Sequence, residues 1–318
     1  DPETGRCLPP ALLPLAIGKA RGSRRLHRRE RPSGCLEQIG QRALNVTGLE
    51  VLARCPFQFW STYCLRLKAL EPRLWEGNLS PLERGSLLHL FLEEFFRDAV
   101  GQMEDCVRAG EWLEGGGEED AGVGRAREAV AKRLDLLSPL ASHALIREIE
   151  RMAGEYCRLL VTGQLESGVP LVLEERVERK WESPGLLVRG KIDRLDRRHT
   201  GLRIVDYKSG RRPWQSARER NLQLEAGFLI QPRIYPWLAS TDEESRPGFS
   251  FLYLGGGAPC EEEIGLDGPV EDWLEPLAEL LHSAAFLPTP REHFEVWGVA
   301  DLNPCARCGL AFLCRRED

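Results

Sequence analysis

A change of hydrophobic pattern near residue 170 divides this 318-residue chain into a helical part and a strand-rich part. Upstream of it, apolar residues recur every three or four positions, which is typical of amphipathic helices. Downstream, the segments 171–181, 186–195 and 202–207 read as short β-strands. Helices around a short run of strands indicate an α/β fold, with a mixed central β-sheet flanked by helices, a helical insertion and a cysteine-rich C-terminal segment.

Helices are predicted on both sides of these strands. The first spans about residues 47–67, with Thr47 as its N-cap and a kink at Pro56. A second begins at Ser80, because Ser80-Pro81-Leu82-Glu83 is a capping box with proline at the first helical position. Glycines at 115–117 and 122–124 predict a loop. Further helices are expected over about 125–137, 140–162, 218–239 and 270–285, with one more strand over 249–254.

The composition excludes two classes of protein. No stretch approaches the roughly 18 to 20 uncharged apolar residues that a membrane-spanning helix needs. The net charge of −6 excludes a uniformly basic nucleic-acid coat protein, so any contact with nucleic acid must use local patches. The apolar run Leu8–Ile17 precedes the basic cluster Arg21–Arg31, the reverse of the order in a secretory signal, and we expect a cytoplasmic protein.

The ends of the chain give expectations about its domains. Residues 1–40 are rich in proline, glycine and arginine without clear periodicity, and we expect a linker or the end of an upstream domain there. Residues 41–318 are expected to form one domain. Because the sequence starts at Asp1 rather than Met, we expect it to be a piece of a longer protein.

Acidic and basic side chains fall at the ends of two neighbouring predicted strands. Gly190-Lys191-Ile192-Asp193 belongs to one strand and Ile204-Val205-Asp206-Tyr207-Lys208 to the next. A tight turn between the strands places Asp193 and Asp206 side by side. Two converging carboxylates repel each other unless a cation lies between them, and Mg²⁺ prefers such oxygen ligands. Lys208 points to the same side of its strand as Asp206, where it can orient a nucleophile and offset charge in phosphoryl transfer. The alternative is a salt bridge at the end of a hairpin.

Other candidate site residues are less specific. His89 and Glu93 share one helical face, and Gly85 permits close approach of the backbone, although His89 alone could be a core histidine. Gln231 and Tyr235 are likewise four residues apart on a predicted helix. Asp196 is a competing acid for the position of Asp193.

Basic residues follow the second of these strands. Arg211, Arg212, Arg218 and Arg220 surround Trp214. The arginines could contact backbone phosphates while Trp214 stacks on a base. The alternative is a solvated charged loop.

The cysteines form a metal-type pattern near the C-terminus. Cys305, Cys308 and Cys314 follow C-x₂-C-x₅-C spacing, and Cys55, in a Cys-Pro-Phe context, is the best candidate for a fourth ligand, with Cys64 as its rival. Four thiolates suit either an iron–sulfur cluster or zinc, and spacing alone does not separate the two.

Taken in order, these motifs resemble a known family. Gly85-x₃-His89-x₃-Glu93, the Gly190–Asp193 motif, the Ile204–Lys208 motif and Gln231-x₃-Tyr235 are similar to those of the RecB-family exonuclease branch of the PD-(D/E)XK nuclease superfamily, over about residues 47–315. The resemblance implies a restriction-endonuclease-like core and a metal-dependent DNA exonuclease. It implies that Mg²⁺ or Mn²⁺ is held by Asp193, Asp206, the Tyr207 carbonyl and His89. Lys208 would be the catalytic lysine, and Gln231 and Tyr235 would support the DNA end or the active site.

The cysteine pattern is similar to that of AddB-type nucleases. This resemblance implies a 4Fe–4S cluster on Cys55, Cys305, Cys308 and Cys314 that ties together the two ends of the domain. It also implies a helicase subunit or domain as partner, in DNA repair and recombination. Two alternatives remain: a catalytically inactive DNA-binding or scaffold module with a four-cysteine metal site, and a zinc-containing structural domain with no role on nucleic acid.

Overall fold

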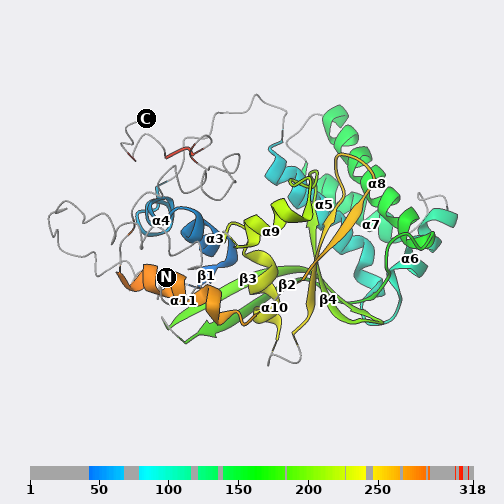
Figure 1. Ribbon diagram of the computed structural model, residues 1–318. Helices are drawn as coiled ribbons and strands as arrows, with labels where there is room; N and C mark the ends of the chain where they lie inside the picture. The colour runs from blue at the N-terminus through cyan, green and yellow to red at the C-terminus, as the bar shows by residue number, and fades with distance from the viewer. Residues whose placement is uncertain are drawn as a thin grey trace.

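The computed structural model describes residues 43–67, 79–115, 121–134, 139–182, 185–225, 227–240, 246–265, 268–283, 286, 305, 308–310 and 314 (Figure 1). The expected linker over residues 1–40 and most of the C-terminal segment lie outside the described residues. The described part has the expected fold class, a mixed central sheet flanked by helices. Its strands are β1 (Leu44–Asn45), β2 (Val169–Trp181), β3 (Leu186–Arg198), β4 (Gly201–Lys208), β5 (Gly248–Tyr253) and β6 (Cys260–Ile264).

The order of the strands leaves a gap beside β3. The sheet runs β1-β3-β4-β5-β6, and β2 also pairs with β3, in antiparallel register over nearly its whole length. Since β2 occupies one edge of β3, β1 and β4 share the other edge. β1 pairs in parallel with Val188 and Arg189, and β4 pairs antiparallel from Arg194 to Arg198. The segment Gly190–Asp193 therefore lies between the ends of β1 and β4.

Helices cover both faces of this sheet (Figure 1). A large apolar cluster joins the face that carries Val205, Tyr207 and Leu252 to four helices drawn together in Figure 1, α5 to α8. On the other face, Ile204, Phe249 and other strand residues pack with Trp214 and α9. The helices are α3 (Val46–Arg54), α4 (Pro56–Phe59), α5 (Pro81–Phe96), α6 (Asp105–Glu114), α7 (Ala121–Arg133), α8 (Pro139–Val161), α9 (Ala217–Glu225), α10 (Gln231–Ala239) and α11 (Glu271–Ser283), with a π-helical turn Trp60–Cys64 and a 3₁₀ turn Arg97–Ala99.

A third cluster holds the N-terminal segment against the end of the sheet. It joins α3, α10 and α11 to the outer parts of β2 and β3. The apolar groups of this cluster include Leu49, Leu52, Ile234 and Leu281, none of them more than 1% exposed. Within the described ranges, no helix combines the length and the hydropathy required to cross a bilayer.

The first predicted helix differs in detail. Its N-cap is Asn45, whose side chain accepts from Gly48 N at 2.7 Å, and Thr47 lies inside α3. Pro56 does not kink a continuous helix, because Cys55 is extended (φ −155°, ψ 99°) and Pro56 starts α4. The residue before a proline is sterically disfavoured in helical conformation, so the chain breaks at Cys55 instead of bending.

Other elements are partly as expected. The capping box is confirmed: Ser80 Oγ accepts from Glu83 N, and Glu83 Oε2 accepts from Ser80 N. The loop expected at 122–124 is wrong, since these residues belong to α7. The single helix expected over 218–239 is wrong as well. It is broken into α9 and α10 around Gly227, whose φ of +70° is a conformation that helices do not use. The elements α6, β1 and β6 were not predicted.

Candidate active site

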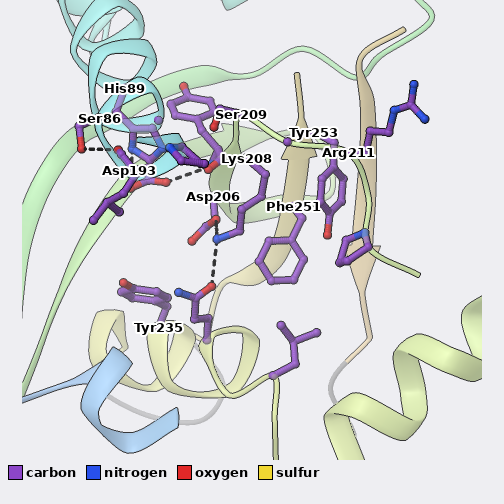
Figure 2. A pocket seen from close by; sticks show the side chains of 18 of the residues that line it. Ser86, His89, Asp193, Asp206, Lys208, Ser209, Arg211, Tyr235, Phe251 and Tyr253 are labelled. Atoms are coloured by element: carbon purple, nitrogen blue, oxygen red, sulfur yellow. Dashed lines mark hydrogen bonds and ion pairs between the residues drawn. The ribbon is translucent and has the colours of Figure 1, made fainter. Parts of the chain in front are cut away.

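Two pockets meet at the gap in the sheet, and Ser86, His89 and Asp193 line both of them. The first has a volume of about 470 Å³ and lies between the start of α5, the ends of β4 and β5, and the start of α10 (Figure 2). The second, about 550 Å³, lies between α5 and the strands β2 and β3. Volumes of this size are typical of small-ligand sites.

His89 on α5 joins three segments of the chain where the pockets meet. Its Nε2 lies 3.1 Å from the backbone oxygen of Tyr207, and its Nδ1 lies 3.2 Å from Glu174 Oε1 and 3.3 Å from Asp193 Oδ1. Burial disfavours the charged ring, but hydrogen bonds and charges from Asp193 and Glu174 outweigh this and raise the pKa of His89 to about 10. Both ring nitrogens of His89 therefore face oxygen atoms of metal-type ligands, from Tyr207 on one side and from Glu174 and Asp193 on the other.

Asp193 and Asp206 lie next to each other, as the predicted hairpin implies. The register pairs Arg194 with Val205, so the two acids are the next residues beyond this pair. Asp193 Oδ2 accepts from the backbone N–H of Tyr207 at 2.9 Å, which ties the end of β4 to β3.

Asp206 and Lys208 form an ion pair on the pocket wall. The Lys208 Nζ lies 2.5 Å from Asp206 Oδ2 and donates to Gln231 Oε1 at 3.1 Å (Figure 2). Burial, together with the charge of Asp193, raises the pKa of Asp206 to about 7 against the opposing effect of Lys208. The structure thus brings together Lys208, Gln231 and both predicted acids.

The donor set fits a divalent cation. Among the described residues, one group of three ligand atoms lies within 4.8 Å of one another, from His89, Glu174 and Asp193. Glu174 Oε1 and Asp206 Oδ2 are buried and make no hydrogen bond there, only ion-pair contacts. Buried carboxylate oxygens that converge in this way are ligands that a hard cation prefers.

Glu174 is the site residue that sequence reasoning missed. It lies on β2, between the Gly85–Glu93 motif and the Gly190–Asp193 motif, and its carboxylate also contacts Lys191 Nζ. Burial alone would raise its pKa, but His89 and Lys191 lower it overall. Glu174 has a φ of +51°, which is unusual for a residue with a side chain. Glu93 lines the second pocket, and its pKa is raised by burial and by Glu174.

Two glycines allow helices to approach the site closely. A Cβ on Gly85 of α5 would lie 3.3 Å from Ser209 Oγ, which agrees with the expected close approach of the backbone there. A Cβ on Gly190 of β3 would lie 2.6 Å from Tyr235 Cε1. The missing side chain of Gly190 therefore lets α10 place Tyr235 against β3, where the ring stacks on Phe249.

Asp196 is excluded as the competing acid. Both Asp196 and Arg194 are fully buried, and Arg194 donates to the two carboxylate oxygens of Asp196 at 2.5 and 2.7 Å. Arg194 also contacts Asp105 of α6 and the Tyr156 hydroxyl. This buried cluster faces away from the pocket that Asp193 lines, because successive residues of a strand point to opposite faces.

The residues predicted to contact nucleic acid differ in their exposure to solvent. Arg211 and Arg212 are exposed, and Arg211 lines the first pocket. The expectation that Trp214 stacks on a base is wrong, because its indole is 2% exposed, packs edge-on against Tyr253 and donates to Glu262 Oε2 at 2.7 Å. Arg220 also pairs with Glu262, at 2.8 Å.

The four predicted cluster ligands lie in two distant parts of the sequence. Cys55 is buried at the junction of α3 and α4, and Cys305, Cys308 and Cys314 are partly exposed. The Cys308 N–H donates to Cys305 O at 3.3 Å. Within the described residues, these cysteines do not form a group of sulfurs within 4.8 Å of one another. The cluster stays a prediction.

The chain is similar to known proteins over most of its length. Residues 43–315 match the sequence model of the PD-(D/E)XK nuclease superfamily. A stretch of the chain is 32% identical over 185 residues to an ATP-dependent helicase/deoxyribonuclease subunit from Desulfitobacterium hafniense, which covers 52% of this chain and 14% of that protein. Over 174 residues it is 30% identical to an ATP-dependent helicase/nuclease subunit from Heliobacterium modesticaldum, covering 52% of this chain and 11% of that protein. The matched region is thus a small part of these relatives.

Solved structures are also similar at low identity, and one of them is an exonuclease by its name. The putative exonuclease from Eubacterium rectale is 12% identical, with a TM-score of 0.43 and coverage of 93% of this chain and 96% of that one.

Proposed function

Since the chain belongs to the PD-(D/E)XK nuclease superfamily, we propose that it is a divalent-metal-dependent DNA exonuclease and the nuclease module of a helicase–nuclease protein in DNA repair and recombination. The observation that carries this proposal is the meeting of His89, Glu174 and Asp193 beside the Asp206–Lys208 pair, at a pocket open to solvent. Two curated relatives are named as helicase/nuclease subunits, which supports a helicase partner.

The side chains have separable roles in phosphodiester hydrolysis. His89, Glu174, Asp193 and Asp206, with the Tyr207 carbonyl, would hold Mg²⁺ or Mn²⁺, which supplies a Lewis acid for the phosphate and a more acidic bound water. Lys208 presents its ammonium beside Asp206, where it can donate to a phosphate oxygen or orient the attacking water.

Two residues of α10 support this arrangement. Gln231 accepts from Lys208 and so limits the directions in which the ammonium can point. Tyr235 lines the same pocket beside Gly190, where it can bound the space for the substrate. Arg211 and Arg212, both exposed next to the pocket, supply positive charge for the backbone of a DNA end.

The test is digestion of end-labelled linear DNA, single- and double-stranded, with Mg²⁺, Mn²⁺ or EDTA. Closed circular DNA is the control that separates exonuclease from endonuclease activity. We expect the wild type to shorten linear DNA only with a metal ion, and Asp206→Asn to be inactive with an unchanged melting temperature. Undiminished cleavage by Asp206→Asn would refute the assignment. Binding of DNA without cleavage by the wild type would favour the catalytically inactive module.

We also propose that Cys55, Cys305, Cys308 and Cys314 bind a 4Fe–4S cluster. The support is the spacing of these residues and the buried position of Cys55 at a break between two helices. Iron and sulfide analysis of anaerobically purified protein tests this proposal. Stoichiometric zinc without iron would refute it.

A further inference from the structure

Glu50 on α3 makes a contact that the proposed chemistry does not use directly. Its Oε1 accepts from the backbone N–H of Ile230 at 3.1 Å, and the N–H of Gln231 also faces the carboxylate. Burial raises the pKa of the Glu50 carboxyl, while Arg54 and these N–H groups oppose the rise. Burial of this carboxylate costs free energy. Its oxygens face the backbone N–H groups of a single turn of the chain.

That turn is the start of α10. The cap residue of α10 is Ile230, which offers no side-chain cap, and Pro232 lies in the first turn. The first N–H groups of a helix have no partner within the helix. Glu50, from another helix, supplies the acceptor that the local sequence lacks.

α3 holds the same turn at a second point, one helical turn further on. Arg54 Nη2 donates to Phe228 O at 3.1 Å. Gly227 approaches α3 so closely that a Cβ on it would lie 3.6 Å from Ala53 Cβ. The segment 227–231 therefore contacts α3 near both of its ends.

Gln231, the first residue of α10, receives the hydrogen bond from Lys208. A chain of contacts therefore runs from Glu50 through the backbone at Ile230 and the Gln231 amide to the Lys208 ammonium. We propose that Glu50 is a positioning residue for catalysis, which fixes Gln231 and through it the direction of Lys208. This inference rests on the proposed nuclease function. It also makes α3, which ends beside Cys55, a physical link between Cys55 and the candidate active site.

The proposal is tested by a double-mutant cycle between Glu50→Ala and Gln231→Ala. The readout is the single-turnover rate of cleavage of end-labelled DNA with saturating Mg²⁺, alongside thermal melting. Thr47→Ala, an exposed change on the same helix, is the matched control and should cleave at the wild-type rate.

We expect Glu50→Ala to lower the rate about tenfold, the effect of losing one hydrogen bond that orients a catalytic group. In the Gln231→Ala background the same change should have no further effect, because the group that Glu50 positions is gone. Glu50→Gln should restore the rate to within about threefold of wild type, since its amide oxygen still accepts from Ile230 N–H.

Three outcomes overturn the inference. One is a wild-type rate in folded Glu50→Ala. Another is an equal loss in both backgrounds, which would show that Glu50 acts on the fold and not through Gln231. If Glu50→Ala does not fold, Glu50→Asp, which keeps the charge but shortens the reach, takes its place in the cycle, and a wild-type rate there overturns the inference. An inactive wild type would instead refute the nuclease function itself.

Discussion

Replacing Gly190 by alanine tests how closely the position of α10 controls the active site. The added Cβ would lie 2.6 Å from Tyr235 Cε1 and 3.1 Å from Leu238 Cδ1, both on α10. The ring must move by about 0.8 Å to reach the 3.4 Å of ordinary contact. Since the Tyr235 ring is also stacked on Phe249, we expect the helix to move with it.

The stability cost follows from overpacking. Forcing one methyl group into a filled space costs about 1 to 3 kcal/mol. Loss of glycine entropy in the unfolded chain offsets about 0.4 to 1 kcal/mol of this. We expect a net destabilisation of about 1 to 2 kcal/mol, measured as a shift of the urea midpoint with an unchanged slope.

The catalytic cost should be larger than the stability cost. Gln231 begins the same helix, so a shift of α10 also moves the group that holds Lys208. A misplacement of about 1 Å can reduce a rate by about a hundredfold. This loss of rate is measured by single-turnover cleavage at a temperature where the variant is fully folded.

Gly124→Ala is the control for this experiment. Gly124 lies in α7 with nothing within 4 Å of an added Cβ, so the change should leave cleavage unaltered and stabilise the helix by up to about 1 kcal/mol. A Gly190→Ala variant that cleaves at the wild-type rate would refute the reasoning.

Three further changes test other parts of the structure. Glu174→Gln should weaken Mg²⁺ binding at least about tenfold by calorimetry, whereas Glu175→Gln, an exposed neighbour, should not; equal affinities would remove Glu174 from the metal site. Arg194→Met leaves the buried Asp105 without its cation and Asp196 with Arg198 alone, at 3.6 Å, and should destabilise the fold by about 3 to 5 kcal/mol in urea unfolding; an unchanged urea midpoint would refute this. Cys55→Ser should lose iron and sulfide after anaerobic purification while Cys64→Ser keeps both, and the opposite result would show that the fourth ligand is misassigned.

The central part of the site could be predicted because its geometry is local. Asp193 and Asp206 lie on two strands joined by a tight turn, and a hairpin fixes which residues face each other. The capping box at Ser80 is equally local, since both of its hydrogen bonds lie within four residues. The spacing of residues along a strand and the residue types at turns and helix caps determine such features. They can therefore be predicted without knowledge of the rest of the chain.

The parts that could not be predicted depend on distant partners. Glu174 reaches the site because β2 pairs along β3, and nothing near Glu174 in the sequence distinguishes it from Glu175. Trp214 stands among exposed arginines, yet β6 supplies Glu262 as its partner and the sheet buries its ring. The break at Cys55 is the exception, because the steric effect of Pro56 on its predecessor is local and could have been used.

Asp193 and Arg194 are neighbours on β3, and their side chains point to opposite faces of the sheet. This arrangement disfavours incorrect registers of the strand. A slip of β3 by one residue would turn Arg194 toward the pocket and leave Asp105 without its cation, while Asp193 would enter the apolar interior beside Tyr156. Each exchange places an uncompensated charge away from water, which costs several kcal/mol. Asp193 and Arg194, which separate the face of the candidate site from the face of the buried salt-bridge cluster, therefore also disfavour a slipped register of β3.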